Sequence, residues 1–183
     1  MDYYIDIEIK PDTDMRESPL MNLVYTKLHK ALVNLGSEQI GVSFPGYKIK
    51  LGRLLRLHGD KADLNNLHSL NWLGGIAGYC KISDVMNVPA EVKYRTISRI
   101  RTNMSKSKLE RLKRRSSITP AEEKLYKAKM FAQGLDNPYL DLESGSTGQK
   151  HRRFIHFGPL LDQPVEGKFD SYGLSQVATV PWF

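Results

Sequence analysis

Cysteine is almost absent from this chain of 183 residues, because Cys80 is the only one. A single thiol excludes an internal disulfide framework, which fits a reducing compartment. No stretch reaches the ~18 uninterrupted apolar residues of a membrane helix, and the N-terminal residues lack the basic and apolar regions of a signal peptide. The sequence therefore predicts no membrane partner, and we expect a cytoplasmic protein.

The motifs of several common catalytic sites are also missing. The chain has no HExxH pair, no CxxC pair and no Walker loop. These motifs supply ligands for a metal ion or a cradle for nucleotide phosphates. Metal-dependent or nucleotide-driven chemistry therefore has no motif here, and we expect neither a metal site nor a cofactor.

The excess of positive over negative charge is concentrated in one segment. Residues 93–115 contain ten Lys or Arg and a single acid, Glu110. The whole chain has 27 basic and 20 acidic residues and a net charge of +7, so the rest of it is slightly acidic. A concentrated basic run is the usual mark of a polyanion partner such as nucleic acid. Taken alone, the run fits a solvated basic face or a flexible tail about as well.

Hydropathy patterns in the first 92 residues predict alternating strands and helices. Ile5, Ile7 and Ile9 alternate with acids, which is typical of a half-buried strand. Residues 20–35 repeat apolar side chains at helical spacing and end at Gly36, a candidate C-cap. Further elements are expected as strands at 40–44, 51–58 and within 78–88, and as a helix at 61–70 capped by Asp60. This order predicts a ferredoxin-like (RRM-like) domain over residues 1–92.

Residues 93–183 are predicted to form a second domain, which carries the basic helix and completes an α+β protein. Ser107 and Glu110 have the spacing of a capping box, so we expect a helix from Lys108. In that helix Lys108, Arg111 and Arg115 share one face, with Arg114 beside them. A second helix is expected to open at Thr119 with Pro120 in its first turn, and strands are expected at 139–143, 152–157, 169–174 and 180–183.

Two further features could carry chemistry. Residues 144–149 are small and rich in hydroxyls, and basic and aromatic residues follow at 150–154, a combination that can hold phosphates and stack on bases. On its own, this motif is more typical of an ordinary hairpin turn. His29 lies in the first predicted helix, and an imidazole can remove the 2′-hydroxyl proton in metal-free RNA cleavage. A lone histidine on a helix is more often a packed or surface residue.

A series of short motifs in a specific order connects these features. The motifs occupy residues 4–7, 27–29, 40–45, 98–99, 110–115, 144–149, 172–175 and 180–183. Each is weak alone, but their order and spacing make the chain resemble, nearly end to end, the CRISPR RNA-processing endoribonucleases of type I-F systems. Members of that family cut the repeat hairpin of precursor CRISPR RNA without a metal and leave a 2′,3′-cyclic phosphate. They stay bound to the mature guide RNA (crRNA) in the surveillance complex.

The resemblance implies roles for particular residues. His29 is expected to activate the 2′-hydroxyl, Tyr172 to orient His29, and Ser144, with Ser146 beside it, to hold the scissile ribose. The basic helix is expected to lie in the major groove of the stem, while Arg99 reads a guanine near its base. The RNA-binding residues implied in this way are Arg99, Arg101, Lys108, Arg111, Lys113, Arg114, Arg115, Thr147, Gln149, His151, Arg152 and Phe154.

The chain also departs from the family pattern. Arg101 occupies a base-reading position that is often Gln, and His151 occupies the position of an aromatic ring that stacks beneath the stem. Ser116 and Ser117 stand where further arginines are expected, so phosphate contacts are predicted to shift to Lys113, Lys124 or Lys127. The identity of the general acid is left open.

The predicted function is that of a sequence- and structure-specific endoribonuclease that cuts at the 3′ base of the repeat hairpin. Its expected partners are the CRISPR repeat RNA hairpin and the other subunits of the type I-F surveillance complex. One alternative is a non-catalytic hairpin-binding subunit of the same complex. Another is a DNA-binding or ribosome-associated basic protein.

Overall fold

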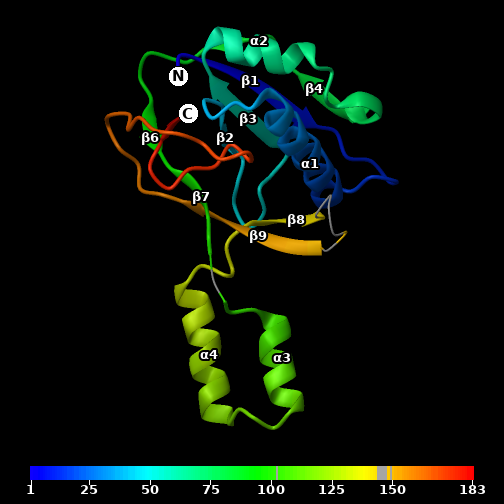
Figure 1. Cartoon of the computed structure of the whole chain (residues 1–183), viewed down its shortest axis with the longest axis vertical. Coiled ribbons are helices and arrows are strands. Elements are labelled where there is room, and N and C mark those ends of the chain that lie inside the picture. Colours follow the sequence, from blue (N-terminus) through cyan, green and yellow to red (C-terminus); the bar gives the residue numbers. More distant parts are fainter. Residues whose placement is uncertain (102, 144–147, 149) are drawn as a thin grey trace.

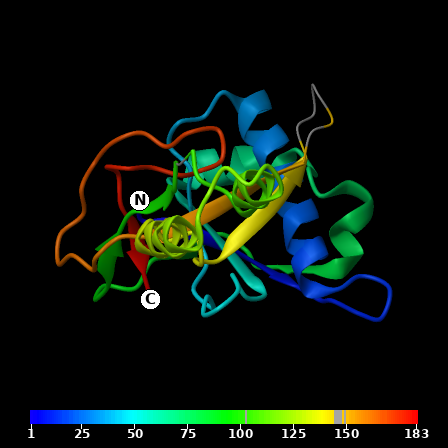
Figure 2. The ribbon, with the colours of Figure 1, turned by 90° about the horizontal axis from the view of Figure 1, so that it is seen from below.

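The computed structural model describes residues 1–101, 103–143, 148 and 150–183. Its helices and antiparallel sheets form a mixed α/β protein, which confirms the predicted fold class at that level. Two helices, α3 (Lys106–Arg114) and α4 (Pro120–Ala132), form a hairpin that stands away from a body built on sheets (Figure 1). Seen from below, the two helices lie side by side (Figure 2).

One antiparallel sheet gathers the strands of the first half of the chain. Its strand order is β2-β3-β1-β4, and β5 also pairs with β1. Directly opposed residues share a face, so Ile5 meets Leu57 and Ile7 meets Leu55 in the core. The elements are, in chain order, β1 (Tyr3–Ile9), α1 (Glu17–Leu35), β2 (Gly41–Ser43), β3 (Leu54–Gly59), α2 (Lys61–Ser69), the 3₁₀ helix η1 (Gly74–Tyr79), β4 (Cys80–Ile82) and β5 (Met86–Asn87).

Helix α1 packs an apolar stripe against the body. Leu20, Val24 and Leu28 recur at helical spacing and are fully buried. Gly36 ends the helix with a φ of 62°, a left-handed conformation that glycine adopts without strain, and its N–H donates to the carbonyl of Val33. The predicted cap is confirmed, and the helix begins three residues earlier than predicted, at Glu17.

The second half of the chain supplies two smaller sheets. Strands β7, β9 and β8 pair in that order, and β10 pairs with β6. The strands predicted at 139–143, 152–157 and 180–183 are confirmed, whereas residues 169–174 form no strand. The strands are β6 (Lys93–Arg95), β7 (Ile97–Arg99), β8 (Tyr139–Glu143), β9 (Lys150–Phe157) and β10 (Val180–Trp182).

A single hydrophobic cluster joins the two halves. Ile7 and Leu28 belong to it, as do Ile155 and Val180 from the far end of the chain. The helical hairpin has buried side chains of its own, which lie outside this cluster: Leu109 on α3 and Met130 on α4. The predicted domain boundary after residue 92 stays a prediction.

Helix α3 begins two residues before its predicted start. The capping residue is Ser105, whose hydroxyl accepts from the N–H of Lys108 at 3.1 Å. The expectation that Ser107 caps the helix is wrong, because Ser107 lies inside the first turn. Two serines with a similar sequence context compete for the cap, and Tyr126 favours the earlier one because its hydroxyl bonds to the backbone of Ser105. The capping box at Thr119 is confirmed.

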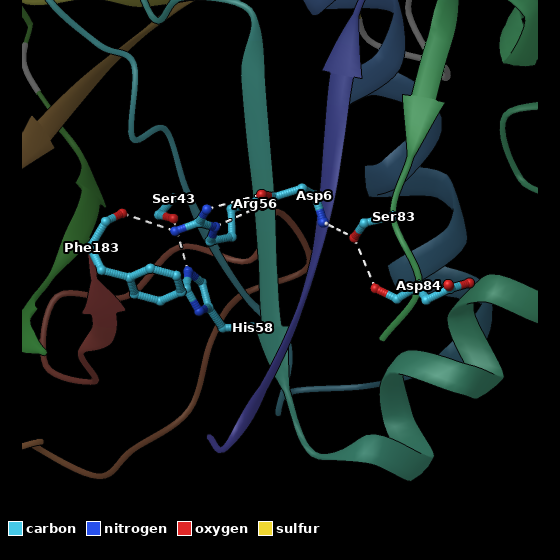
Figure 3. A network of polar contacts seen from close by, with 7 residues as sticks. All are labelled: Asp6, Ser43, Arg56, His58, Ser83, Asp84 and Phe183. Carbon is cyan, nitrogen blue, oxygen red and sulfur yellow. Dashed lines mark hydrogen bonds and ion pairs between the residues drawn. The ribbon is translucent and has the colours of Figure 1, made fainter. Parts of the chain in front are cut away.

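Arg56 and His58 form a buried polar network on β3 (Figure 3). The Arg56 guanidinium donates to both carboxylate oxygens of Asp6, at 2.7 and 2.9 Å, and to the carbonyl of Phe183 at 2.9 Å. The Nε2 atom of His58 lies 2.8 Å from the hydroxyl of Ser43. The pKa of His58 is lowered from 6.5 to about 3, mainly by burial and secondly by the charge of Arg56. His58 is therefore a neutral, structural histidine at physiological pH.

Candidate functional site

His29 faces the aromatic ring of Tyr172 across the interface between α1 and the C-terminal segment. The two rings are stacked, with centroids 3.6 Å apart and an interplanar angle of 6°. Both side chains are half-buried. The structure therefore brings together two residues that the resemblance paired, although they lie far apart in the sequence.

A hydrogen bond selects one tautomer of the His29 ring. Its Nδ1 atom lies 2.8 Å from the carbonyl oxygen of Ser171. A carbonyl oxygen can only accept, so Nδ1 must carry the hydrogen. In the neutral imidazole Nε2 is then unprotonated and can accept a proton. The ring is thus held in the form that a general base requires.

A tight turn presents both partners of His29. The carboxylate of Asp170 accepts from the N–H groups of Tyr172 and Leu174, at 2.9 and 3.0 Å. Gly173 has a φ of +70°, and a Cβ atom there would lie 2.6 Å from Cγ1 of Val42. The prediction of a strand at 169–174 is wrong because these turn contacts outweigh the strand preference of the apolar and aromatic residues.

Arg153 covers the other face of the Tyr172 ring. Its guanidinium carbon lies 3.5 Å from the ring centroid. The arginine is only 4% exposed, and its Nε atom has no hydrogen-bond partner in the part of the chain that the structure describes. Burial lowers the pKa of Arg153, although a guanidinium remains protonated near neutral pH. From the sequence, Arg153 was only a member of the basic and aromatic run at 150–154 and had no role of its own, because the run does not show which of its side chains are buried.

The period of two along β9 divides that run between the faces of the sheet. Arg153 and Ile155 are buried, and His151, on the same face, is half-buried. Arg152 is exposed on the opposite face, where its guanidinium pairs with both carboxylate oxygens of Asp141, at 2.9 and 3.2 Å. Phe154 shares that face and meets the ring of Tyr139 edge-on. The predicted RNA-binding residues of this strand therefore do not form one surface.

Four residues of the predicted site lie outside the described part of the chain. They are Ser144, Ser146, Thr147 and Gln149. The strands that flank them pair with each other, and Glu143 on β8 lies opposite Lys150 on β9. Strand β8 is tied to α1 because the side-chain oxygen of Asn22 accepts from the N–H of Asp141 at 3.2 Å.

The basic helix α3 displays several cations to solvent. Lys108, Arg111, Arg114 and Arg115 are exposed and form no ion pair with any residue that the structure describes. Lys113 differs, because its ammonium group lies 3.2 Å from Glu123 and 3.7 Å from Glu110.

These contacts, led by the hydrogen bond to Glu123, raise the pKa of Lys113. Lys127 pairs with the same Glu123 at 2.6 Å. Two of the three lysines expected to take over phosphate contacts are therefore ion-paired with Glu123, Lys113 across the two helices and Lys127 within α4, although both remain exposed, as Lys124 is.

Arg99 and Arg101 lie next to the turn that carries Tyr172. Both are exposed, and they line an open cleft together with residues of the Asp170 turn and Gln176. The Gln176 side chain donates to the carbonyl of Arg99 at 3.1 Å. A group bound by these arginines would lie close to the elements that hold His29.

The arrangement of side chains and helices also bears on metal sites and membrane spans. Within residues 1–101, 103–143, 148 and 150–183, no group of three or more His, Cys, Asp or Glu is arranged to hold a metal ion. In the same part of the chain, no helix has both the length and the apolar character needed to cross a membrane.

Comparison with known proteins places the chain among relatives of similar length. A model of the CRISPR-associated protein family Cas_Csy4 matches residues 4–183. The CRISPR-associated endonuclease Cas6/Csy4 of Pseudomonas aeruginosa (strain UCBPP-PA14) is 38% identical over 187 residues, with 100% of both chains covered. The protein of the same name from Escherichia coli (strain UTI89 / UPEC) is 40% identical over 189 residues, again with 100% of both covered.

A solved structure, that of the CRISPR endoribonuclease Cse3 bound to 19 nt RNA, is a more distant match. It is 12% identical to this chain and has a TM-score of 0.40. The match covers 99% of this chain and 100% of that one.

Proposed function

The chain belongs to the Cas_Csy4 family of CRISPR-associated proteins, and from that membership we propose that it is the endoribonuclease that processes precursor CRISPR RNA in the cytoplasm. It cuts at the 3′ base of the repeat hairpin and needs no metal ion. Full-length identity of about 40% to two proteins named as CRISPR-associated endonucleases supports this assignment.

The chemical step is attack of a ribose 2′-hydroxyl on the adjacent phosphate. Nε2 of His29 takes the hydroxyl proton, the new O–P bond forms, and the bond to the 5′-oxygen breaks. The leaving 5′-oxygen takes up one proton, and the product ends in a 2′,3′-cyclic phosphate. Tyr172 orients the imidazole, and Ser144 and Ser146 hold the ribose. The observation that carries this proposal is the Nδ1 hydrogen bond of His29, which leaves Nε2 free to act as the base.

The hairpin is held by residues outside the catalytic stack. Helix α3 lies in the major groove of the stem and contacts phosphates through its exposed cations, because that groove opens near a hairpin end. Arg99 and Arg101 read bases at the foot of the stem, beside the Asp170 turn. His151 stacks beneath the stem, and the remaining contacts come from Thr147, Gln149, Arg152 and Phe154.

Many phosphate contacts make product release slow, so the protein stays on the mature crRNA as a subunit of the type I-F surveillance complex. We also assign residues 1–92 to the ferredoxin-like class and residues 93–183 to an RNA-binding part. The strand order β2-β3-β1-β4 supports the first assignment, since ferredoxin-like sheets have this arrangement.

Incubation of the purified protein with its own repeat RNA in EDTA tests the proposal. We expect a single cut at the 3′ foot of the hairpin and a 2′,3′-cyclic phosphate on the product. Tight binding without a cut would instead indicate a non-catalytic hairpin-binding subunit. Equal affinity for duplex DNA of the same sequence would indicate a general nucleic-acid-binding protein, because a reader that depends on the 2′-hydroxyl discriminates against DNA.

A further inference from the structure

Arg153 is a buried cation whose guanidinium lies against an aromatic ring. It is 4% exposed, and it forms no ion pair with a carboxylate of the described residues. Its Nε atom has no hydrogen-bond partner among those residues. A buried charge without a partner destabilises the folded state, and an apolar side chain of similar volume is often tolerated better. Arg153 therefore lowers the stability of the folded protein, so stability does not explain why an arginine occupies this position.

Arg153, Tyr172 and His29 form a three-layer stack. The guanidinium carbon lies 3.5 Å from the centre of the Tyr172 ring, and the imidazole centre lies 3.6 Å from it. Two groups at these distances cannot share one face of a ring, so they occupy opposite faces. The tyrosine is thus enclosed between a cation and the histidine, a favourable arrangement for the electron-rich faces of an aromatic ring.

Tyr25 fixes the same tyrosine from a third direction. Its hydroxyl donates to the backbone carbonyl of Tyr172 at 2.7 Å, and the two rings lie 6.2 Å apart with an interplanar angle of 20°. Tyr25 is fully buried, and burial raises its pKa well above the usual value, so the hydroxyl keeps its proton. The backbone of Tyr172 is therefore held by Tyr25, whereas the plane of its ring is held by Arg153.

We propose that Arg153 is a positioning residue for His29: it presses the Tyr172 ring flat against the imidazole and so keeps Nδ1 on the carbonyl of Ser171 and Nε2 free. This role rests on the proposed function, in which His29 is the base. Without Arg153, the far face of the tyrosine is open, the ring can tilt, and the imidazole loses the surface that defines its plane. Arg153 itself touches no reacting atom.

The tautomer of His29 tests the stack without RNA. Protein labelled with ¹⁵N-histidine gives separate ring signals for protonated and unprotonated nitrogens, and the His29→Ala variant identifies those of His29. In the unchanged protein we expect the neutral ring to be predominantly the Nδ1–H form. In Arg153→Met we expect signals averaged between the two tautomers. Arg153→Lys keeps a cation over the ring and should restore part of the separation between the Nδ1 and Nε2 signals.

Cleavage and stability provide the second test. Arg153→Met should slow single-turnover cleavage about 10- to 100-fold, the usual cost of a small misplacement of a catalytic group. The affinity for a hairpin with a 2′-deoxy nucleotide at the cut should stay within a few-fold. The melting temperature should be unchanged or higher, because the variant removes an unpaired buried charge. A residue with a purely structural role would lose activity and stability together.

Arg95→Met is the matched control. Arg95 is likewise an arginine over aromatic rings, those of Tyr47, Phe157 and Trp182, but it is half-buried and lies outside the stack. This variant should lower the melting temperature while the His29 ring signals and the cleavage rate of the folded protein stay as they were.

Unchanged tautomer signals and unchanged cleavage in Arg153→Met would overturn the positioning role. Failure of the unchanged protein to cleave would instead contradict the proposed function, and the RNA-free measurement would still decide whether Arg153 orders the histidine.

Discussion

The imidazole of His29 and the phenol ring of Tyr172 lie face to face, 3.6 Å apart and 6° from parallel. Contact between the two rings covers one face of the imidazole and leaves its edge uncovered. The carbonyl of Ser171 occupies the Nδ1 side of that edge. Only Nε2 remains for a proton that arrives from the RNA, and the catalytic role of His29 can be tested through this atom.

Replacing His29 with Ala should abolish cleavage and spare binding. General base catalysis typically contributes about 10²- to 10⁴-fold, so the single-turnover rate should fall by that factor. His29 lies outside the basic helix, so the affinity for a 2′-deoxy hairpin should change by no more than a few-fold. A large loss of affinity would identify His29 as a binding or structural residue.

The ring of Tyr172, and not its hydroxyl, should matter for cleavage. The hydroxyl forms no hydrogen bond with a residue that the structure describes, so Tyr172→Phe should cleave nearly as fast as the unchanged protein. Tyr172→Leu removes the stacking surface and should slow cleavage about 10- to 100-fold. Equal losses in the two variants would show that the hydroxyl takes part.

Arg114→Ala combined with Arg115→Ala should weaken hairpin binding and flatten its dependence on salt. Each lost phosphate contact lowers the slope of log K against log salt by about one unit, so we expect a change of about two. Lys113→Ala is the control, because Lys113 is already paired with Glu110 and Glu123 and should change the slope less. An unchanged slope in the double variant would place these arginines away from the RNA.

Acid should destabilise the fold through His58. Its pKa is about 3 in the folded state and near 6.5 when unfolded, so between these values only the unfolded chain binds the proton. Stability is therefore lost as the pH falls below about 6.5, by up to about 1.4 kcal/mol per pH unit. Unfolding by urea between pH 7 and 4.5 measures this slope.

The His58→Gln variant should show a shallower slope over the same pH range. His68→Gln, which changes an exposed histidine on α2, should keep the slope of the unchanged protein. Equal slopes in all three proteins would assign the acid sensitivity to other groups.

The corrected start of α3 has its own test. Ser105→Ala removes the cap that accepts from Lys108 and should destabilise the helix by about 1 kcal/mol. Ser107→Ala should have little effect, because Ser107 lies inside the helix. Amide hydrogen exchange in the first turn of α3 measures the effect of each variant. Faster exchange in Ser107→Ala and unchanged exchange in Ser105→Ala would show that Ser107 is the cap.

Periodic segments of the fold could be predicted from the sequence, because their burial pattern is local. The stripe of α1, its Gly36 cap and the strand Tyr139–Glu143 are examples. Residues 169–174 could not, since the side-chain contacts of Asp170 and the tight packing at Gly173 form a turn where apolar residues favour a strand.

The candidate site could be predicted only in part, because contacts between distant segments of the chain assemble it. His29 and Tyr172 were paired by resemblance, not by any local signal. Arg153 stands in a run that looks uniformly basic. The alternation of a strand could have separated it from Arg152, but which of the two faces the core depends on α1 and the Asp170 turn.

The helical hairpin and the histidine stack are built from different parts of the chain. The hairpin carries Lys108, Arg111 and Arg114 on α3, and its buried Leu109 and Met130 stand apart from the main core, whereas the histidine stack is built from α1, β9 and the Asp170 turn. If the hairpin holds RNA phosphates as proposed, substitutions between residues 105 and 133 should change the affinity for the stem and leave the geometry of the histidine stack as it is.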